Sequence, residues 1–114
     1  MVRFMILIKA DKNSEAGVLP DEKLLTEMGK YNEELVKAGV MLAGEGLHPS
    51  SKGARVKFSG GTPVITDGPF AEAKEALGGY YLVEASDLDE ALKVAQQAPA
   101  PFGGVEVRPV RTFD

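Results

Sequence analysis

The chain has 114 residues, a length that fits a single domain, and a formal net charge of −4. Hydrophobic residues make up 44% of it and charged residues 26%, which is typical of a soluble globular protein and argues against disorder. The acidic balance and the absence of any block of Lys or Arg argue against binding to nucleic acid or to an anionic membrane surface.

Residues 2–9 predict a β-strand, because they are rich in β-branched and aromatic side chains. Strand alternation places Phe4 and Ile6 on one face and Met5 and Leu7 on the other, so we expect both faces to be at least partly buried. This apolar run is much too short to span a membrane, and charged residues follow it where a signal-peptide cleavage site would lie. We therefore expect a cytoplasmic protein.

An amphipathic helix is predicted over residues 21–38, after a loop of residues 10–20. Acidic residues open the helix, which is favourable at a helix N-terminus, and Gly39 suits the position just after its end. Apolar residues recur at helical spacing and predict one buried stripe. The stripe consists of Leu24, Met28, Tyr31 and Leu35, widened by Leu25 and Val36.

The middle of the chain predicts three short strands. Residues 40–47 form the first of them. Residues 54–58 and 63–66 flank a Gly-Gly pair and are expected to form a hairpin. Residues 71–76 are long enough for a single helical turn.

The C-terminal part returns to a strand–helix–strand pattern. Residues 80–85 predict a strand, and Ser86 is expected to cap a helix that ends before Pro99. Residues 105–113 predict a last strand, part of which Pro109 demotes to an edge or a bulge. The apolar face of the helix consists of Leu88, Ala91, Leu92 and Ala95.

This order of elements predicts an α+β fold with a ferredoxin-like (split βαβ) arrangement in one domain, residues 1–114. Two helices cover only one face of such a sheet, whereas residues 2–9 and 80–83 place apolar side chains on both faces. A second apolar face needs a cover, and the simplest cover is another copy of the chain. We therefore predict a homodimer whose two sheets face each other and enclose a cavity.

Residues 66–75 read TDGPFAEAKE and are followed by LGGYY at residues 77–81. With these two motifs the chain resembles the DGPF branch of the YCII-related proteins. Residues 44–47, GEGL, and 105–109, VEVRP, support it in the same order along the chain. The resemblance implies a dimeric α+β barrel of ferredoxin-like subunits, with a function that is mostly unassigned.

The same resemblance implies two kinds of activity. Some YCII-related relatives look like small-molecule enzymes that use a His–Asp pair for acid–base chemistry, whereas DGPF-type proteins tend to accompany extracytoplasmic-function sigma factors, which points to regulation. Many DGPF-type sequences carry an amide where this chain has His48. A His–Asp mechanism is therefore suggested for this chain more than for its family.

His48 and Asp67 are the candidate catalytic residues. Asp67 precedes Gly-Pro at a predicted strand end, where it is able to act as a general base or to orient one; alternatively its side chain stabilises the turn. Histidine is the residue type suited to carry a proton at physiological pH; His48 follows the second strand, and a pairing with Asp67 would fix its tautomer. The alternative is a solvent-exposed loop histidine.

Five further charged residues are candidate substrate-binding groups. The compact charged turn after Phe70 is placed to line a pocket mouth, or it is a solvated turn with weak ion pairs. Arg108 shares a strand face with Glu106, which we expect to point into the inter-sheet cavity or onto the dimer seam, and its planar geometry suits clamping a carboxylate. Alternatively this charged pair makes an inter-subunit or cross-strand ion pair, with Arg3 or Glu45 as the partner. The candidates are Glu45, Glu72, Lys74, Glu75 and Arg108.

The composition favours a protein without a metal or an organic cofactor. The chain has no cysteine and a single histidine, so one subunit cannot assemble a Cys- or His-rich metal site. Its glycines occur in pairs and match neither a phosphate-binding loop nor a dinucleotide fingerprint. Two hypotheses remain open: a cofactor-independent enzyme that transfers protons on a small organic molecule, and a non-catalytic ligand-binding or regulatory module. A monooxygenase is a third, resting on fold analogy alone.

Overall fold

Four strands form one antiparallel sheet in the computed structural model, which describes residues 1–70, 76–99 and 104–112. The strands are β1 (Val2–Lys9), β2 (Met41–Gly46), β5 (Leu77–Ala85) and β6 (Val105–Pro109). Their order is β2-β5-β1-β6, and each is antiparallel to its neighbours. The first strand–helix–strand unit contributes β1 and β2, which are separated by β5. The second contributes β5 and β6, which are separated by β1, so the two units interlock. The predicted α+β class is confirmed.

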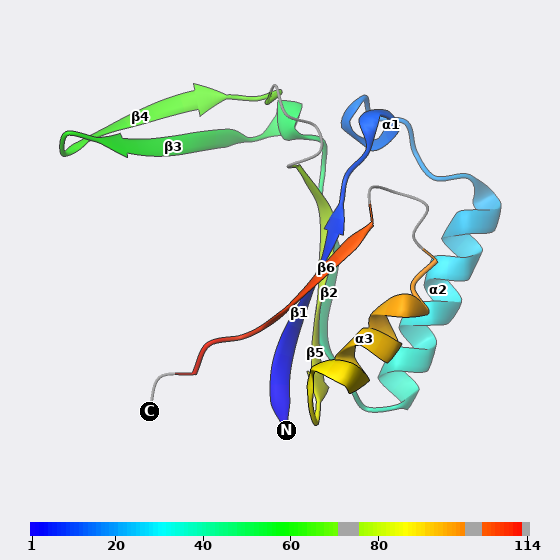
Figure 1. The fold of residues 1–114 in the computed structure, drawn as a ribbon. Helices are drawn as coiled ribbons and strands as arrows, with labels where there is room; N and C mark the ends of the chain where they lie inside the picture. Colours follow the sequence, from blue (N-terminus) through cyan, green and yellow to red (C-terminus); the bar gives the residue numbers. More distant parts are fainter. Residues whose placement is uncertain (71–75, 100–103, 113–114) are drawn as a thin grey trace.

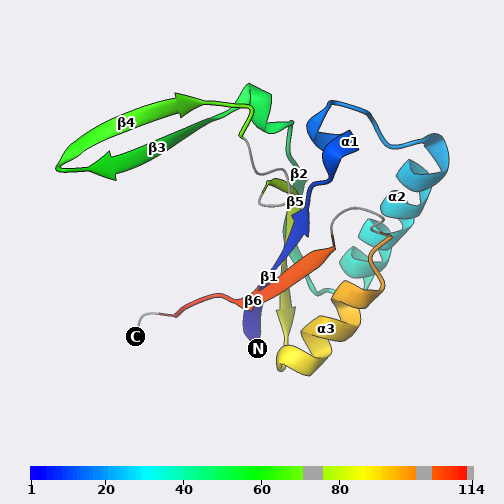
Figure 2. The same cartoon turned by 45° about the horizontal axis from the view of Figure 1, so that its top comes forward.

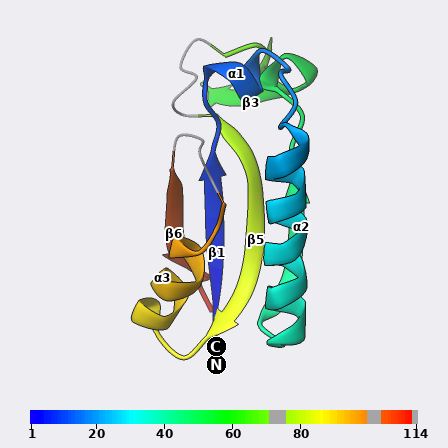
Figure 3. The same ribbon diagram turned by 90° about the vertical axis from the view of Figure 1, so that its right-hand side faces the viewer.

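Two helices, α2 (Glu22–Lys37) and α3 (Leu88–Gln96), cover one face of this sheet (Figures 1 and 3). Each helix begins with an aspartate whose carboxylate accepts a hydrogen bond from the third backbone N–H of the helix, which stabilises the helix N-terminus. The core lies between these helices and the sheet. It consists of Phe4, Ile6, Tyr31, Leu35, Tyr81, Val83, Ala85, Ala91 and Ala95.

No described helix covers the opposite face of the sheet (Figure 1). Met5 and Leu7 of β1 lie there, opposite Leu82 and Tyr80 of β5, and all four side chains are half-buried. We call the surface formed by these four residues the open face. The prediction that β1 and β5 carry apolar side chains on both faces is confirmed.

The predicted hairpin is confirmed, and it stands apart from the main sheet. Its strands, β3 (Ala54–Ser59) and β4 (Thr62–Asp67), pair only with each other. The hairpin projects from one end of the sheet toward the side of the open face, away from α2 and α3 (Figures 1 and 2). We call this hairpin, β3 and β4 with the turn between them, the arm.

Two local predictions at helix starts are wrong. Residues 10–20 contain a short helix, α1 (Lys12–Glu15), which the side chains of Asp11 and Ser14 cap reciprocally. The helix predicted to start at Ser86 is capped instead by Asp87, whose carboxylate accepts the backbone N–H of Glu90 at 2.9 Å. In both cases an aspartate side chain reaches the third N–H of the helix, which is the contact that defines the cap.

The strand boundaries near Gly and Pro also differ from the prediction. β5 begins at Leu77, three residues early, because its glycines allow close approach to β2: a Cβ on Gly79 would lie 2.8 Å from the carbonyl oxygen of Glu45. The last strand ends at Pro109, which has no N–H to donate. The predicted helical turn at residues 71–76 falls largely on residues outside the described ranges.

The apolar faces of the helices are narrower than predicted. Leu25 and Val36 of α2 are 54% and 64% exposed and do not widen its buried stripe. On α3, Leu88 and Leu92 point away from the centre of the core, which the smaller Ala91 and Ala95 occupy. Within the described ranges, no helix combines the length and the apolar composition that a bilayer crossing needs.

Two buried tyrosines link α2 to the sheet and make stability sensitive to alkaline pH. The rings of Tyr31 and Tyr81 meet edge to face, with centroids 5.5 Å apart, and the Tyr31 hydroxyl donates to the Val94 carbonyl oxygen at 2.8 Å. Burial, with a smaller contribution from Tyr81, raises the pKa of Tyr31 to about 12, and burial also raises the pKa of Tyr81. The folded protein therefore holds these protons at a pH where the unfolded chain has lost them.

We expect the free energy of unfolding to fall between pH 10 and pH 12, since the folded pKa of Tyr31 lies above its unfolded value of 10.0. Its share of the loss is roughly 2–3 kcal/mol, at about 1.4 kcal/mol per pKa unit. Tyr31→Phe removes this pH-dependent contribution. Urea unfolding at several pH values should therefore show that the difference in the free energy of unfolding between wild type and variant becomes smaller above pH 10. Parallel stability curves would contradict the account.

Candidate functional site

A cavity of about 680 Å³ lies at one end of the sheet, between α2, the connection from α1 to α2, and the ends of β2 and β5. We call it the main cavity. Its size is typical of pockets that bind small organic molecules. Most of its side chains are apolar, including Ile8, Val18, Leu19, Met28, Leu47 and Leu77. The polar side chains at its border are Ser14, Glu15, Asn32, Glu45, His48, Ser51 and Lys52.

A second cavity of about 240 Å³ shares part of this lining, and we call it the small cavity. Glu15, Leu47, His48 and Leu77 border both cavities, so the two are neighbours. The small cavity adds one side chain from before the arm, one from the base of the arm and two from the chain after it. These are Ser50, Arg55, Phe70 and Ala76.

Glu15 connects three separate segments at the wall between the cavities. Its carboxylate accepts the backbone N–H of Ser50 at 3.0 Å and also the Ser50 hydroxyl, in the short helix η1 (Ser50–Lys52). The Ser50 hydroxyl oxygen in turn accepts the backbone N–H of Phe70 at 3.2 Å. These hydrogen bonds fix α1, η1 and the segment after β4 relative to one another, so this wall is held in place by polar contacts.

Arg55 stacks on Phe70 beside the small cavity. The guanidinium carbon lies 3.8 Å from the centroid of the ring, which is a cation–π contact. Sequence reasoning missed Glu15, Ser50 and Arg55. The aspartate and serine three residues apart that cap α1 were a usable signal for the helix that carries Glu15, but no local pattern signals contacts between segments so distant in the chain.

The structure places the two candidate catalytic residues differently. His48 follows β2, is exposed, and borders both cavities. Asp67 ends β4, where it pairs with Ala54, is exposed, and borders neither cavity. No hydrogen bond joins them in the described part of the chain, and the Asp67 carboxylate makes none there with the turn that follows it.

The chain after Asp67 passes very close to η1. The Gly68 N–H donates to the Gly53 carbonyl oxygen at 2.9 Å. A Cβ on Gly68 would lie 1.7 Å from the carbonyl oxygen of Ser50, a separation that atoms do not adopt. The glycine is therefore required by this close approach, which positions Phe70 beside the small cavity.

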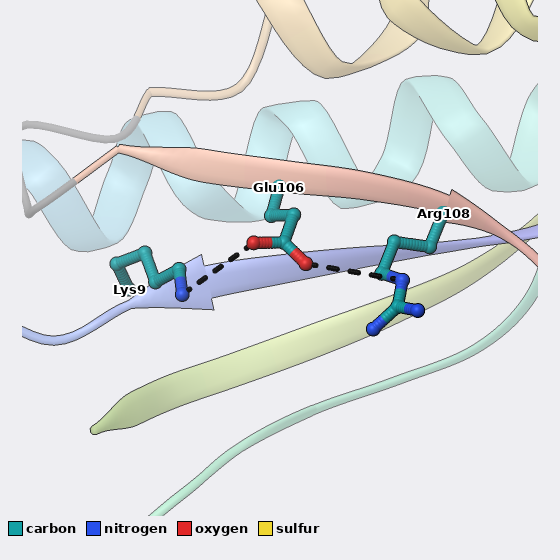
Figure 4. Close-up of polar contacts among 3 residues, drawn as sticks. All are labelled: Lys9, Glu106 and Arg108. Atoms are coloured by element: carbon teal, nitrogen blue, oxygen red, sulfur yellow. Dashed lines mark ion pairs between the residues drawn. The ribbon is translucent and has the colours of Figure 1, made fainter. Parts of the chain in front are cut away.

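The candidate binding residues divide between the cavities and the open side of the sheet. Glu45, at the end of β2, borders the main cavity. Arg108 borders neither cavity and lies on β6 in a charged row with Glu106 and Lys9 (Figure 4). Glu106 is 3.6 Å from Lys9 and 4.0 Å from Arg108, and within the described residues of one subunit neither Glu106 nor Arg108 forms an ion pair with Arg3 or Glu45. Such exposed pairs contribute less than about 1 kcal/mol each.

The other three candidates, Glu72, Lys74 and Glu75, lie outside the described residues. Among the residues that the structure does place, no group of three or more His, Asp or Glu side chains is arranged to hold a metal ion. What the described site offers is an apolar cavity with a few ionisable groups at its border. Such a cavity suits a small molecule with an apolar body and one or two polar groups.

Two comparisons with known proteins cover most of the chain. A family model described as YCII-related domain matches residues 2–114. An uncharacterised protein from Rhizobium meliloti (strain 1021) is 35% identical over 96 residues, which is 82% of this chain and 77% of that protein. The range matched by the family model includes the sheet, the helices and the residues that border the cavities.

Proposed function

The chain belongs to the family of YCII-related domains, and from this premise we propose that it works as a homodimer that binds a small organic molecule in the main cavity. We assign it to the DGPF branch on residues 66–70, TDGPF. The strand order β2-β5-β1-β6, with all neighbours antiparallel, supports a ferredoxin-like subunit.

The open face supports the dimer. Met5, Leu7, Tyr80 and Leu82 form a contiguous apolar surface that none of the described helices covers. Two sheets that stack face to face lie about 10 Å apart and bury such side chains on both sides. Stacking two open faces gives the dimeric α+β barrel that the resemblance implies.

The main cavity carries the proposal of ligand binding. Its volume of about 680 Å³ and its apolar walls favour a small organic molecule, and the polar groups at its border provide orientation. His48 borders this cavity from an exposed position, and histidine is a common proton donor and acceptor. This position favours proton transfer to or from the bound molecule as a second function of the same site.

Filling the main cavity should weaken the binding of small molecules at least tenfold. Gly46 borders the cavity, and a Cβ placed on it has open space within 4 Å, so Gly46→Leu extends a side chain into that space. We expect at least a tenfold loss of affinity for fragments that bind the wild type, because a leucine side chain occupies the volume they need. Binding is measured by ligand-observed NMR with a library of small organic acids, amides and alcohols.

The matched control is Gly29→Leu, at an α2 position that also has open space but borders neither cavity. This variant should bind fragments as the wild type does, whereas equal binding by Gly46→Leu would contradict the proposed site. The same screen separates binding from catalysis. If a fragment is converted to a product by the wild type, His48→Gln should retain binding and lose the conversion.

A further inference from the structure

The arm, formed by β3, β4 and the turn between them, has one apolar face and one mostly polar face. Its cross-strand pairs include Val56 with Ile65 and Phe58 with Pro63, which share one face. The other face carries Arg55, Lys57, Thr62, Val64 and Thr66. The arm is thus amphipathic, as a strand pair is when one side packs on protein.

Nothing in the described part of the chain covers the apolar face of the arm. Phe58 is 79% exposed, Ile65 is 70% exposed and Val56 is 52% exposed. A two-stranded hairpin is marginally stable by itself, and packing against another surface is what normally stabilises one. An apolar patch of this kind is typical of a protein–protein contact.

The shape of the subunit agrees with an element that lacks its packing partner. The radius of gyration is 15.8 Å, whereas a globular chain of this length has a value of about 13 Å. The arm accounts for much of this expansion, because it extends well beyond the layers of sheet and helix (Figures 1 and 2).

A second copy of the chain is the occupant that fits. The arm points to the same side as the open face, so a copy stacked on that face comes within its reach (Figures 1 and 2). Strands of six residues are about 20 Å long, and four strands are about 19 Å wide, so the arm is long enough to extend across a partner sheet.

The area also favours an arm that takes part in the interface. The uncovered side of the whole four-stranded sheet, with the open face at its centre, spans on the order of 400 Å² in plan, about half of the ~800 Å² that each partner contributes to a stable complex. The apolar face of the arm adds about 200 Å² more. We propose that the arm of each subunit crosses the dimer and packs its apolar face on the partner subunit, an inference that rests on the proposed homodimer.

Val56 and Val64 provide a matched test. They are the same residue on adjacent strands, 52% and 49% exposed, but they lie on opposite faces of the arm. We expect Val56→Ser to raise the dissociation constant of the dimer at least tenfold, since each dimer loses two apolar contacts, and Val64→Ser to leave it within about twofold. Phe58→Ser should weaken the dimer more than Val56→Ser does. Sedimentation equilibrium measures the constant, and circular dichroism verifies that each variant is folded.

Equal dissociation constants for Val56→Ser, Phe58→Ser, Val64→Ser and wild type would overturn the role of the arm. The dimer through the open face would stand in that case, because wild type would still associate. A wild type that does not associate at all would overturn both proposals. A photo-crosslinking residue in place of Phe58 gives an independent reading: crosslinks between isotopically distinct chains support the arm contact, and crosslinks confined to one chain oppose it.

Discussion

Leu82→Glu should convert the proposed dimer into a folded monomer. Leu82 lies on the open face, opposite Met5 of β1 and Ala43 of β2 in the sheet pairing. In a dimer of stacked open faces, both copies would bury the new carboxylate, and an unpaired buried charge costs several kcal/mol. We expect the dissociation constant to rise at least hundredfold, which corresponds to about 2.7 kcal/mol.

Leu92→Glu is the control for this change. Leu92 lies on α3, on the other side of the sheet, and is already 38% exposed, so the same substitution should leave the dimer intact. Light scattering after size exclusion gives the mass of both variants, and circular dichroism verifies their fold. A second open-face variant, Leu7→Glu, should behave as Leu82→Glu does. Two open-face variants that both remain dimers would place the interface elsewhere.

Gly68→Ala should produce the largest loss of stability among glycine substitutions in this chain. The added Cβ would lie 1.7 Å from the carbonyl oxygen of Ser50, and the contact is with backbone, which has little freedom to move. Displacing either segment also breaks the hydrogen bond from the Phe70 N–H to the Ser50 hydroxyl oxygen. We expect the free energy of unfolding to fall by roughly 2–4 kcal/mol in urea titrations.

Gly29→Ala tests whether the loss of stability comes from the close approach of Gly68 to Ser50 or follows from replacing any glycine by alanine. Gly29 lies inside α2 with open space around its Cβ position, so alanine should stabilise the protein there by up to about 1 kcal/mol, its helix propensity being higher. Opposite signs for the two variants support the account. An unchanged unfolding midpoint in Gly68→Ala would show that residues 67–70 do not lie against η1.

The sequence predicted the sheet and its two-sided character because strand alternation is a strong local signal. Phe4 and Ile6 are buried beneath the helices, and Met5 and Leu7 lie on the open face, as alternation requires. The helix predicted over residues 21–38 is confirmed within one residue at each end, since its polar start and following glycine mark both limits. The four residues of α1 were missed, because they are too few to show a helical period.

The cavity walls were much harder to predict, because they depend on contacts between distant segments. Glu15 and Ser50 are 35 residues apart, and the contact between Arg55 and Phe70 depends on the pairing of β3 with β4. Asp67 was expected at a strand end that opens toward a cavity between two subunits, and it does end a strand, at the base of the arm, which projects toward the side of the open face. Arg108 was placed on the correct strand face, which is the open side of the sheet, because Val105 and Val107 of the same strand pack on the core under the helices.

The central claim is that the open face is buried against a second copy of the chain, and the mass of the wild-type protein in dilute solution tests it most directly. Sedimentation equilibrium at about 10 µM should give twice the 12.1 kDa of the chain, since an interface of ordinary size holds a dimer together at that concentration. A mass of 12.1 kDa for a folded protein under the same conditions would contradict the account.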